Sequence, residues 1–208
     1  MRFRPVSPDA LVERLVDAVA ARGRGGWTRL LVDGAPPAGT GDLAAALVEP
    51  LRVLGHPVLR VRAADFLRPA SLRFEHGKQD PDARLDLWLD EGALRREVLD
   101  PLDPGGTGRV LPSLWDAAAD RATRADYAVL PPGGVLVLDG ELLLGRGLPH
   151  ELSVHLWLSP AALARRLAAE EHWALPAFAR YEDEVDPLRA AGTGVRADDP
   201  RHPALLVA

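Results

Sequence analysis

The stretch from Arg29 to Leu47 constrains the fold more than any other part of the chain. It reads RLLVDGAPPAGTGDLAAAL: a short apolar run, a turn rich in glycine and proline, and then a run of alanine and leucine. These are the signals of a buried strand, a tight loop and a helix, in that order. This order is the layout of a phosphate-binding loop, in which backbone N–H groups curl around phosphate oxygens.

The loop keeps the spacing of the motif G-x-x-x-x-G-K-[ST] but not its two reactive side chains. Gly34 and Gly39 stand at the glycine positions, whereas Thr40 replaces the lysine and Gly41 replaces the serine or threonine. In the motif the lysine neutralises phosphate charge and the hydroxyl binds Mg²⁺. Glycine-rich turns between a strand and a helix also occur without any ligand, so a purely structural loop stays open. The residues expected to contact a nucleotide here are Gly34, Ala38, Gly39, Thr40, Gly41 and Asp42.

Composition places the chain among ordinary globular proteins. It has 208 residues, of which 47% are hydrophobic and 26% charged, enough for one well-buried domain and few for two. A formal net charge of −5 argues against nucleic acid or an anionic membrane as partner. The absence of cysteine excludes disulfides and thiol chemistry. With no signal-peptide pattern and no membrane-spanning apolar run, we expect a cytoplasmic protein.

Strand and helix signals alternate along the chain. Ser7-Pro8 and Ser159-Pro160 each match a helix start, with serine as N-cap and proline at the first helical position. Apolar runs typical of buried parallel strands lie at residues 30–32, 58–61, 135–140, 153–159 and 194–196. The alternation predicts an α/β fold, a three-layer α/β/α domain with a parallel sheet of about five strands.

The chain is expected to form a single domain over residues 1–208. Residues 27–62 form a core with the glycine-rich loop, and residues 133–208 return to that core with a lid-like helix. Between them, residues 67–132 carry no clear strand and are expected to form a substrate pocket. Within this excursion the spacing of apolar residues over 85–102 favours a helix. Pro50 is expected to kink or end the helix that follows the loop.

Two carboxylates stand where ligands bind in parallel sheets, beyond the carboxyl ends of the strands. Asp65 ends the second strand and could accept a proton from a hydroxyl that attacks a phosphate. Asp139 follows four apolar residues and could orient Mg²⁺, with Glu141 as a second candidate ligand. For both aspartates the alternative is a turn residue that only hydrogen-bonds nearby backbone.

Further candidates come from the later helix and from the excursion. Arg165 and Arg166 could close over phosphates as a lid, although in so arginine-rich a chain a solvated helix face explains them better. Trp115 and Asp116 could stack on and hydrogen-bond a base, although a tryptophan is as often a core residue. The histidines show no metal-ligand spacing, which gives no reason to expect a structural metal.

The order of these parts resembles the uridine kinase family of P-loop phosphotransferases, from about Arg29 to about Pro203. GAPPAGTGDLA matches the family's phosphate loop in place and length. ADFLRP resembles its D-D-F-Y segment, and VLVLDGELL resembles V-V-x-x-E-G-I-L. DPDARLDLW and LPSLWDAAADR resemble two segments near the sugar, and ALARRLAAEE resembles the lid's R-R-x-x-R-D.

The resemblance implies a role for each matching residue. Asp65 would lie at the base that activates a nucleoside 5′-hydroxyl, Asp139 at the acidic position, and Arg165 with Arg166 in the lid. If the protein is active, ATP and Mg²⁺ would be its cofactors and a nucleoside-like small molecule its substrate. The residues expected at the substrate, from the sequence and the resemblance together, are Phe66, Arg68, Arg73, His76, Asp82, Trp115, Asp116 and Arg121.

The departures from the family's pattern leave two functions open. Besides Thr40 and Gly41, Ala169 replaces the later lid arginine and Asp120 replaces the pocket histidine. Loss of one preorganised donor typically costs about 10²–10³ in rate, roughly 3–4 kcal/mol.

The first function is a nucleoside kinase-like phosphotransferase in which another arginine replaces the lysine; the candidates are Arg68, Arg73, Arg165 and Arg166. The second is a catalytically impaired kinase-fold module that binds a nucleotide, nucleoside or phosphate. Another enzyme class that reuses the pocket is a weaker third alternative.

Overall fold

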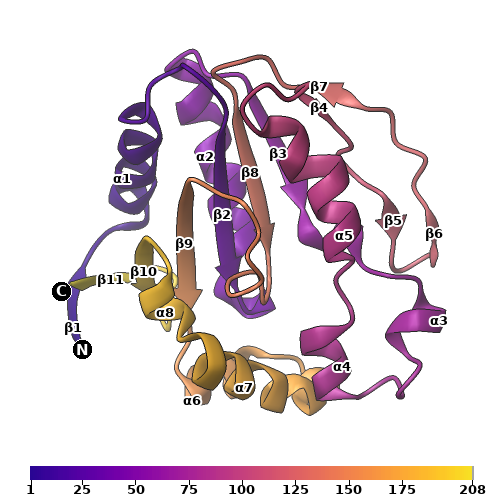
Figure 1. Ribbon diagram of the computed structural model, residues 1–208. Coiled ribbons are helices and arrows are strands. Elements are labelled where there is room, and N and C mark those ends of the chain that lie inside the picture. Colours follow the sequence, from indigo (N-terminus) through magenta and orange to yellow (C-terminus); the bar gives the residue numbers. More distant parts are fainter. Residues whose placement is uncertain (208) are drawn as a thin grey trace.

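Seven strands form the central sheet of the protein in this computed structural model, which describes residues 1–207 (Figure 1). They are β1 (Arg2–Pro5), β2 (Thr28–Gly34), β3 (Val58–Arg62), β8 (Val135–Gly140), β9 (Leu152–Trp157), β10 (Thr193–Arg196) and β11 (Ala204–Val207). Their order in space is β1-β11-β10-β9-β2-β8-β3. Strands β10, β9, β2, β8 and β3 run parallel, while β11 and β1 extend the sheet antiparallel at one edge. The expected parallel sheet of about five strands is confirmed, and the antiparallel pair adds to it.

Helices and the sheet together form the three-layer α/β arrangement expected from the sequence. The helices are α1 (Pro8–Ala20), α2 (Thr40–Val53), α3 (Ala70–Arg73), α4 (Pro81–Asp86), α5 (Glu91–Leu94), α6 (Pro160–Arg166), α7 (Leu175–Val185) and α8 (Pro187–Ala190). Helix α2 packs on β2, β3 and β8 and against α1. The parallel strands point downward in Figure 1, and α4, α6 and α7 lie below their carboxyl ends.

The two predicted serine caps are present. Ser7 Oγ accepts a hydrogen bond from the N–H of Ala10 at 3.1 Å, and Ser159 Oγ accepts one from Ala162 at 3.3 Å. Each cap satisfies a backbone donor that the helix itself leaves free. Helix α2 continues to Val53, three residues beyond Pro50, and so ends within one turn of the proline.

Strand β2 leads directly into the loop and lies in the interior of the sheet. Every residue from Thr28 to Gly34 is buried between β8 and β9. A parallel strand covered on both faces needs such a run of apolar side chains. The one long polar side chain in it, Arg29, is neutralised by Glu151 and Asp103.

The single helix expected over residues 85–102 is not present; several shorter elements take its place. The chain forms α4 and α5, then a wide π-type turn over Arg95–Leu99 and a 3₁₀ turn over Asp100–Leu102. The break lies at residues 87–90, where Leu89 pairs with Leu67 and the Asp90 carboxylate caps α5. Beyond it, two short ladders join β4 (Arg109–Val110) to β7 (Ala128–Val129) and β5 (Trp115–Asp116) to β6 (Arg121–Ala122).

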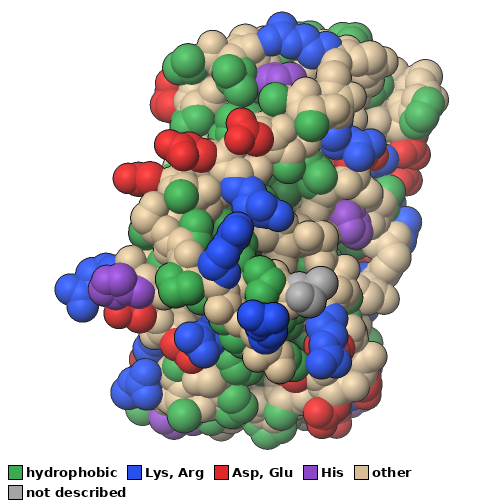
Figure 2. Space-filling view, turned by 90° about the vertical axis from the view of Figure 1, so that its left-hand side faces the viewer, with side chains coloured by type: hydrophobic (Ala, Val, Ile, Leu, Met, Phe, Trp, Pro, Cys, Tyr) green, Lys and Arg blue, Asp and Glu red, His purple; other side chains and the backbone are tan. Residues whose placement is uncertain are grey.

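The side of the molecule that carries α1 and both ends of the chain is drawn in Figure 2. Arginine side chains stand there among acidic and hydrophobic ones instead of forming a continuous basic stripe. Within residues 1–207, no helix combines the length and the apolar character that crossing a bilayer requires.

Candidate ligand site at the carboxyl edge of the sheet

Two cavities flank the loop between β2 and α2. The loop cavity, of about 250 Å³, is lined by Gly34, Pro36, Thr40, Arg62, Ala63, Ala64, Leu67, Arg84, Trp88, Leu89, Asp139, Gly140, Glu141, Leu142 and Arg146. The lid cavity, of about 320 Å³, lies under α6 and α7 and touches the loop at Ala35. Both open at the carboxyl edge of the parallel strands, where ligands bind in folds of this class.

A close contact explains Gly34 of the loop, and the backbone conformation explains Gly39. A Cβ on Gly34 would lie 2.8 Å from the backbone oxygen of Leu156 in β9 and 3.1 Å from Cγ2 of Thr40. Gly39 has φ +88°, a conformation that side chains disfavour. The side chain of Thr40 is buried with its methyl group next to Gly34, and it carries no positive charge with which to replace the motif's lysine.

The first turn of α2 faces the loop as a potential anion site. Gly39 is the N-cap, and no side chain of the described residues caps this end. The N-terminus of a helix presents free N–H donors and a partial positive charge, which together suit a phosphate group. Asp42 lies in the same turn and contributes a negative charge to it.

Arg60 binds the acidic residue that the sequence places at a metal. Its Nε donates to Asp139 Oδ1 at 2.7 Å and its Nη2 to Asp139 Oδ2 at 3.0 Å. A Cβ on Gly41 would lie 3.1 Å from the same Nη2 and 3.6 Å from Asp139 Oδ2. The hydrogen bonds with Asp139 raise the pKa of Arg60 above its usual range, so the guanidinium is charged at any ordinary pH.

Arg62 pairs with the candidate base in the same way. Its Nε and Nη2 donate to the two oxygens of Asp65 at 3.0 and 2.7 Å. Asp65 stands in the 3₁₀ turn Ala63–Phe66 that follows β3, and its side chain is 17% exposed against 61% for Arg62. An exposed arginine exchanges partners easily, so this pair is weaker than the one between Arg60 and Asp139.

Arg84 holds the second candidate metal ligand. It donates to both oxygens of Glu141, at 3.2 and 3.0 Å, and to Glu171 at 2.5 Å. The guanidinium carbon also lies 5.3 Å from the ring centroids of Trp88 and Trp173, and the side chain is only 7% exposed. Burial lowers the pKa of Arg84, but the two glutamates raise it by more, which keeps the group charged.

The three carboxylates at this edge are thus each held by two hydrogen bonds from one arginine. Mg²⁺ prefers carboxylate and water oxygens in octahedral geometry. Both oxygens of Asp139 and both of Glu141 already accept from arginine, and Gly41 has no hydroxyl. Residues 1–207 contain no cluster of three or more metal-ligating side chains. The residues present therefore do not fit the Mg²⁺ site expected from the resemblance.

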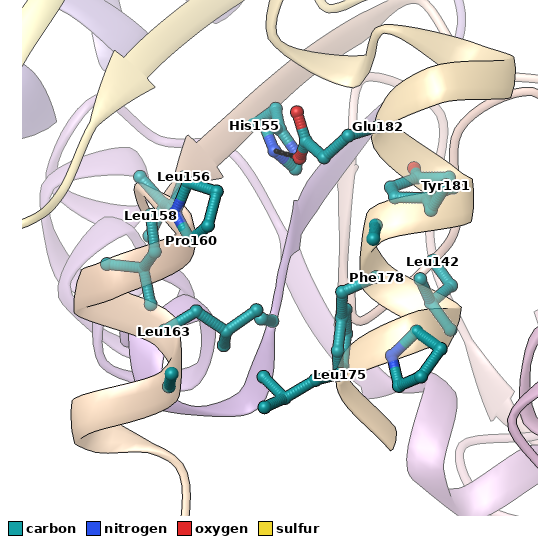
Figure 3. Close-up of a pocket in the computed structure, with 14 residues that line it drawn as sticks. Leu142, His155, Leu156, Leu158, Pro160, Leu163, Leu175, Phe178, Tyr181 and Glu182 are labelled. Atoms are coloured by element: carbon teal, nitrogen blue, oxygen red, sulfur yellow. Dashed lines mark ion pairs between the residues drawn. The ribbon is translucent and has the colours of Figure 1, made fainter. Parts of the chain in front are cut away.

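A buried polar network lies at one side of the lid cavity, where Figure 3 shows His155 next to Glu182, with Tyr181 on the neighbouring helix. Asp33, the last carboxylate of β2, accepts hydrogen bonds from His155 Nδ1 at 2.7 Å, from the hydroxyl of Tyr181 at 2.8 Å and from the N–H of Leu143 at 2.9 Å. His155 Nε2 in turn lies 3.8 Å from Glu182 Oε1. The network thus links β2 and β9 to the lid helix α7.

The charges of this network set its protonation. Burial lowers the pKa of His155, but the hydrogen bond with Asp33 and the charge of Glu182 raise it by more, to about 9. His155 is therefore a cation at neutral pH. Burial, together with the charge of Asp33, raises the pKa of Tyr181 far above its usual range, so this hydroxyl stays protonated.

Four residues predicted from the sequence line the loop cavity: Gly34, Thr40, Asp139 and Glu141. The two lid candidates, Arg165 and Arg166, do not line this cavity. Arg165 is exposed and its guanidinium is 3.5 Å from the backbone oxygen of Ala161, whereas Arg166 donates to the backbone of Ala197 at 3.0 Å.

The eight candidate substrate residues also lie outside the lining of the loop cavity. Phe66 is fully buried in the core, and Arg73 donates to the backbone of Arg68 and Ala117. Asp82 pairs with Arg180 on the surface. The rest lie on the excursion: Arg68 half-buried, His76 and Arg121 exposed, Trp115 hydrogen-bonded to Asp120, and Asp116 accepting from the turn at residues 118–119.

The residues that sequence reasoning missed are Asp33, Arg60, Arg62, Arg84, Arg146, His155, Tyr181 and Glu182. Some carried a visible signal. Asp33 directly precedes the first glycine of the loop motif, and His155 interrupts an apolar strand. Arg60 and Arg62 alternate in β3, so that both lie on one face of the sheet next to Asp139.

Comparison with solved structures identifies the fold. No protein-family model matches the sequence, and no curated protein matches it. The structure is similar to "a Possible Uridine Kinase from Bacillus stearothermophilus", with a TM-score of 0.69 and 18% identity over 87% of this chain and 95% of the other. It is also similar to a "putative fructose transport system kinase" from Silicibacter sp., with a TM-score of 0.64 and 22% identity over 84% and 95% of the two chains. The chain therefore has the P-loop kinase fold of these two structures.

Proposed function

We propose that the chain is a kinase-fold binding module that holds a nucleotide or another phosphate-bearing small molecule at the loop between β2 and α2. The phosphate lies at the N-terminus of α2, and the rest of the ligand occupies the loop cavity. The observation that carries this proposal is the pairing of Asp65, Asp139 and Glu141 with arginines, next to a helix N-terminus without a side-chain cap.

The loop cavity supports a ligand of nucleoside size. Its volume of about 250 Å³ is slightly below the usual range for small-molecule sites, so part of the ligand would remain at the surface. Trp88 contributes an aromatic wall on which a base or sugar can stack. The lining contains Arg62, Arg84 and Arg146 beside Asp139 and Glu141. Outside the lining, these arginines pair with Asp65, Glu171 and Glu91.

Phosphoryl transfer from ATP to a nucleoside-like hydroxyl is the second candidate function, and the position of Asp65 favours it. Asp65 directly follows β3, next to the loop cavity, where a general base would be needed. Transfer would require Arg62 to release this carboxylate. Because Arg62 is 61% exposed, such a release costs little.

Titration calorimetry and a transfer assay separate the two candidates. The protein is titrated with ATP, ADP and nucleoside monophosphates, and ADP release from ATP is followed with a panel of nucleosides and sugars. Binding without acceptor-dependent ADP release supports the binding module. Acceptor-dependent release that Asp65→Asn abolishes, while the exposed-helix control Arg52→Gln retains it, supports the kinase. If no phosphate compound binds up to millimolar concentration, both functions are wrong.

A further inference from the structure

We propose that Arg60 takes the place of the divalent cation at this site, so that the loop binds its phosphate ligand without Mg²⁺. This inference rests on the proposed function, since it concerns how the same loop neutralises the ligand. It goes beyond that function because it assigns the metal's task of neutralising Asp139 to a residue of β3.

Three departures from the motif coincide at one point. The hydroxyl that would bind Mg²⁺ is absent at Gly41, the acidic residue Asp139 is bound at both oxygens, and the guanidinium of Arg60 fills the space between them. A side chain at position 41 would have to share that space, because its Cβ would lie 3.1 Å from Nη2 of Arg60. Glycine at this position therefore makes room for the arginine.

Arg60 neutralises the charge of Asp139, as Mg²⁺ would in a metal-dependent site. Asp139 is 8% exposed, and without a partner its charge would repel a phosphate at the adjoining helix end. In P-loop enzymes the metal neutralises such charge. Here the guanidinium does so permanently, since arginine is not deprotonated in proteins.

Arg60 also keeps donors that the protein does not use. Its hydrogen bonds to Asp139 involve Nε and Nη2, and within residues 1–207 Nη1 donates to no protein acceptor. The side chain is 29% exposed, so water or an anion can reach it. A guanidinium that holds a carboxylate on one side and offers free N–H groups on another suits a phosphate oxygen.

The first test compares ATP binding in excess EDTA with ATP binding in excess Mg²⁺ by calorimetry. We expect ATP to bind in EDTA at least as tightly as in Mg²⁺. Arg60→Gln should weaken binding in EDTA roughly tenfold to a hundredfold, the usual effect of losing a hydrogen bond to a charged group. Arg52→Gln, on the exposed end of α2, is the control and should bind as the wild type does.

Asp139→Asn gives the sharpest distinction, because the two kinds of site predict opposite results. If Arg60 is the cation, removal of the Asp139 charge leaves ATP binding unchanged or makes it tighter. In a metal-dependent site the same change would weaken binding of ATP with Mg²⁺. If Arg60→Gln does not fold, the paired variant Arg60→Gln/Asp139→Asn removes both charges and should still bind ATP in EDTA, but more weakly than Asp139→Asn alone.

A second test needs no nucleotide, so its result does not depend on the proposed function. Mn²⁺ is titrated into the ligand-free protein and followed by electron paramagnetic resonance. We expect no Mn²⁺ bound at Asp139 in the wild type, and weak Mn²⁺ binding in Gly41→Ser/Arg60→Ala, where a hydroxyl and a free carboxylate are created. Mn²⁺ binding by the wild type that Asp139→Asn abolishes, or ATP binding that requires Mg²⁺, would overturn the inference. If neither ATP nor any other phosphate compound binds in either medium while Mn²⁺ behaves as expected, the proposed function is wrong, but the replacement of a metal by Arg60 at Asp139 stands.

Discussion

His155 Nδ1 lies 2.7 Å from Asp33 Oδ2, and this ion pair is buried directly below the glycine-rich loop. The two residues are opposite each other in the parallel pairing of β2 and β9, and their side chains are 3% and 0% exposed. Tyr181 joins the pair from α7, and its hydroxyl accepts from the N–H of Leu144 while donating to Asp33. One buried charge pair therefore fixes the loop, the sheet and the lid helix to one another.

This pair predicts a loss of stability on the alkaline side of neutrality. The pKa of His155 is raised from 6.5 to about 9, so its stabilising contribution is complete below pH 6.5 and is lost as the pH rises through 9. A shift of this size corresponds to about 3 kcal/mol at most. Urea unfolding between pH 6 and pH 9.5 measures it.

The double variant Asp33→Asn/His155→Gln removes both charges at this position. Its free energy of unfolding should vary less over the same pH range than that of the wild type. An equal slope in the two proteins would mean that His155 is not the group responsible. The single variant His155→Leu would leave Asp33 buried and unpaired, which typically costs about 3–5 kcal/mol.

The ion pairs of Arg84 predict a large loss of stability when the arginine is removed and a small one when its exposed partner Glu171 is neutralised. Arg84→Ala would remove the contacts with Trp88 and Trp173 and leave Glu141 without its partner, so we expect a loss of about 3–5 kcal/mol. Glu171→Gln should cost less than about 1 kcal/mol, because Glu171 is 41% exposed. Chemical denaturation of the two variants tests this order, and equal losses would contradict it.

How much of this could be predicted from the sequence depends on the range of the interactions involved. The five parallel strands, the serine caps and the loop follow from residues close together in the chain, and the sequence predicted them. It did not predict β1, β11 or the short strands β4 to β7. The pairing of Arg60 with Asp139 spans 79 residues and that of His155 with Asp33 spans 122, so no local pattern contains either. Asp139 and Glu141 line the loop cavity, but an apolar run before a carboxylate does not show whether a metal or an arginine binds it.

The close approach of Gly140 to Ala63 allows a steric test at the carboxyl edge of the sheet. A Cβ on Gly140 would lie 2.6 Å from the Cβ of Ala63, so Gly140→Ala should destabilise the protein by about 1–3 kcal/mol. Ala63→Gly/Gly140→Ala removes one of the two clashing methyl groups and should recover part of this loss. Thermal unfolding of the single and double variants measures the recovery, and its absence would show that the contact with Leu143 dominates instead.

Gly34 offers the most direct test of the loop. An added Cβ would meet the backbone oxygen of Leu156 at 2.8 Å, and backbone in a central strand cannot move aside as a side chain can. Gly34→Ala should therefore cost about 1–3 kcal/mol in the free energy of unfolding and should abolish ATP binding, because the loop must shift. Gly26→Ala is the matched control. No atom lies within 4 Å of its added Cβ, so its stability should stay within about 0.5 kcal/mol of the wild type and its ATP binding should be unchanged. Normal ATP binding by folded Gly34→Ala would mean that the ligand does not use this loop.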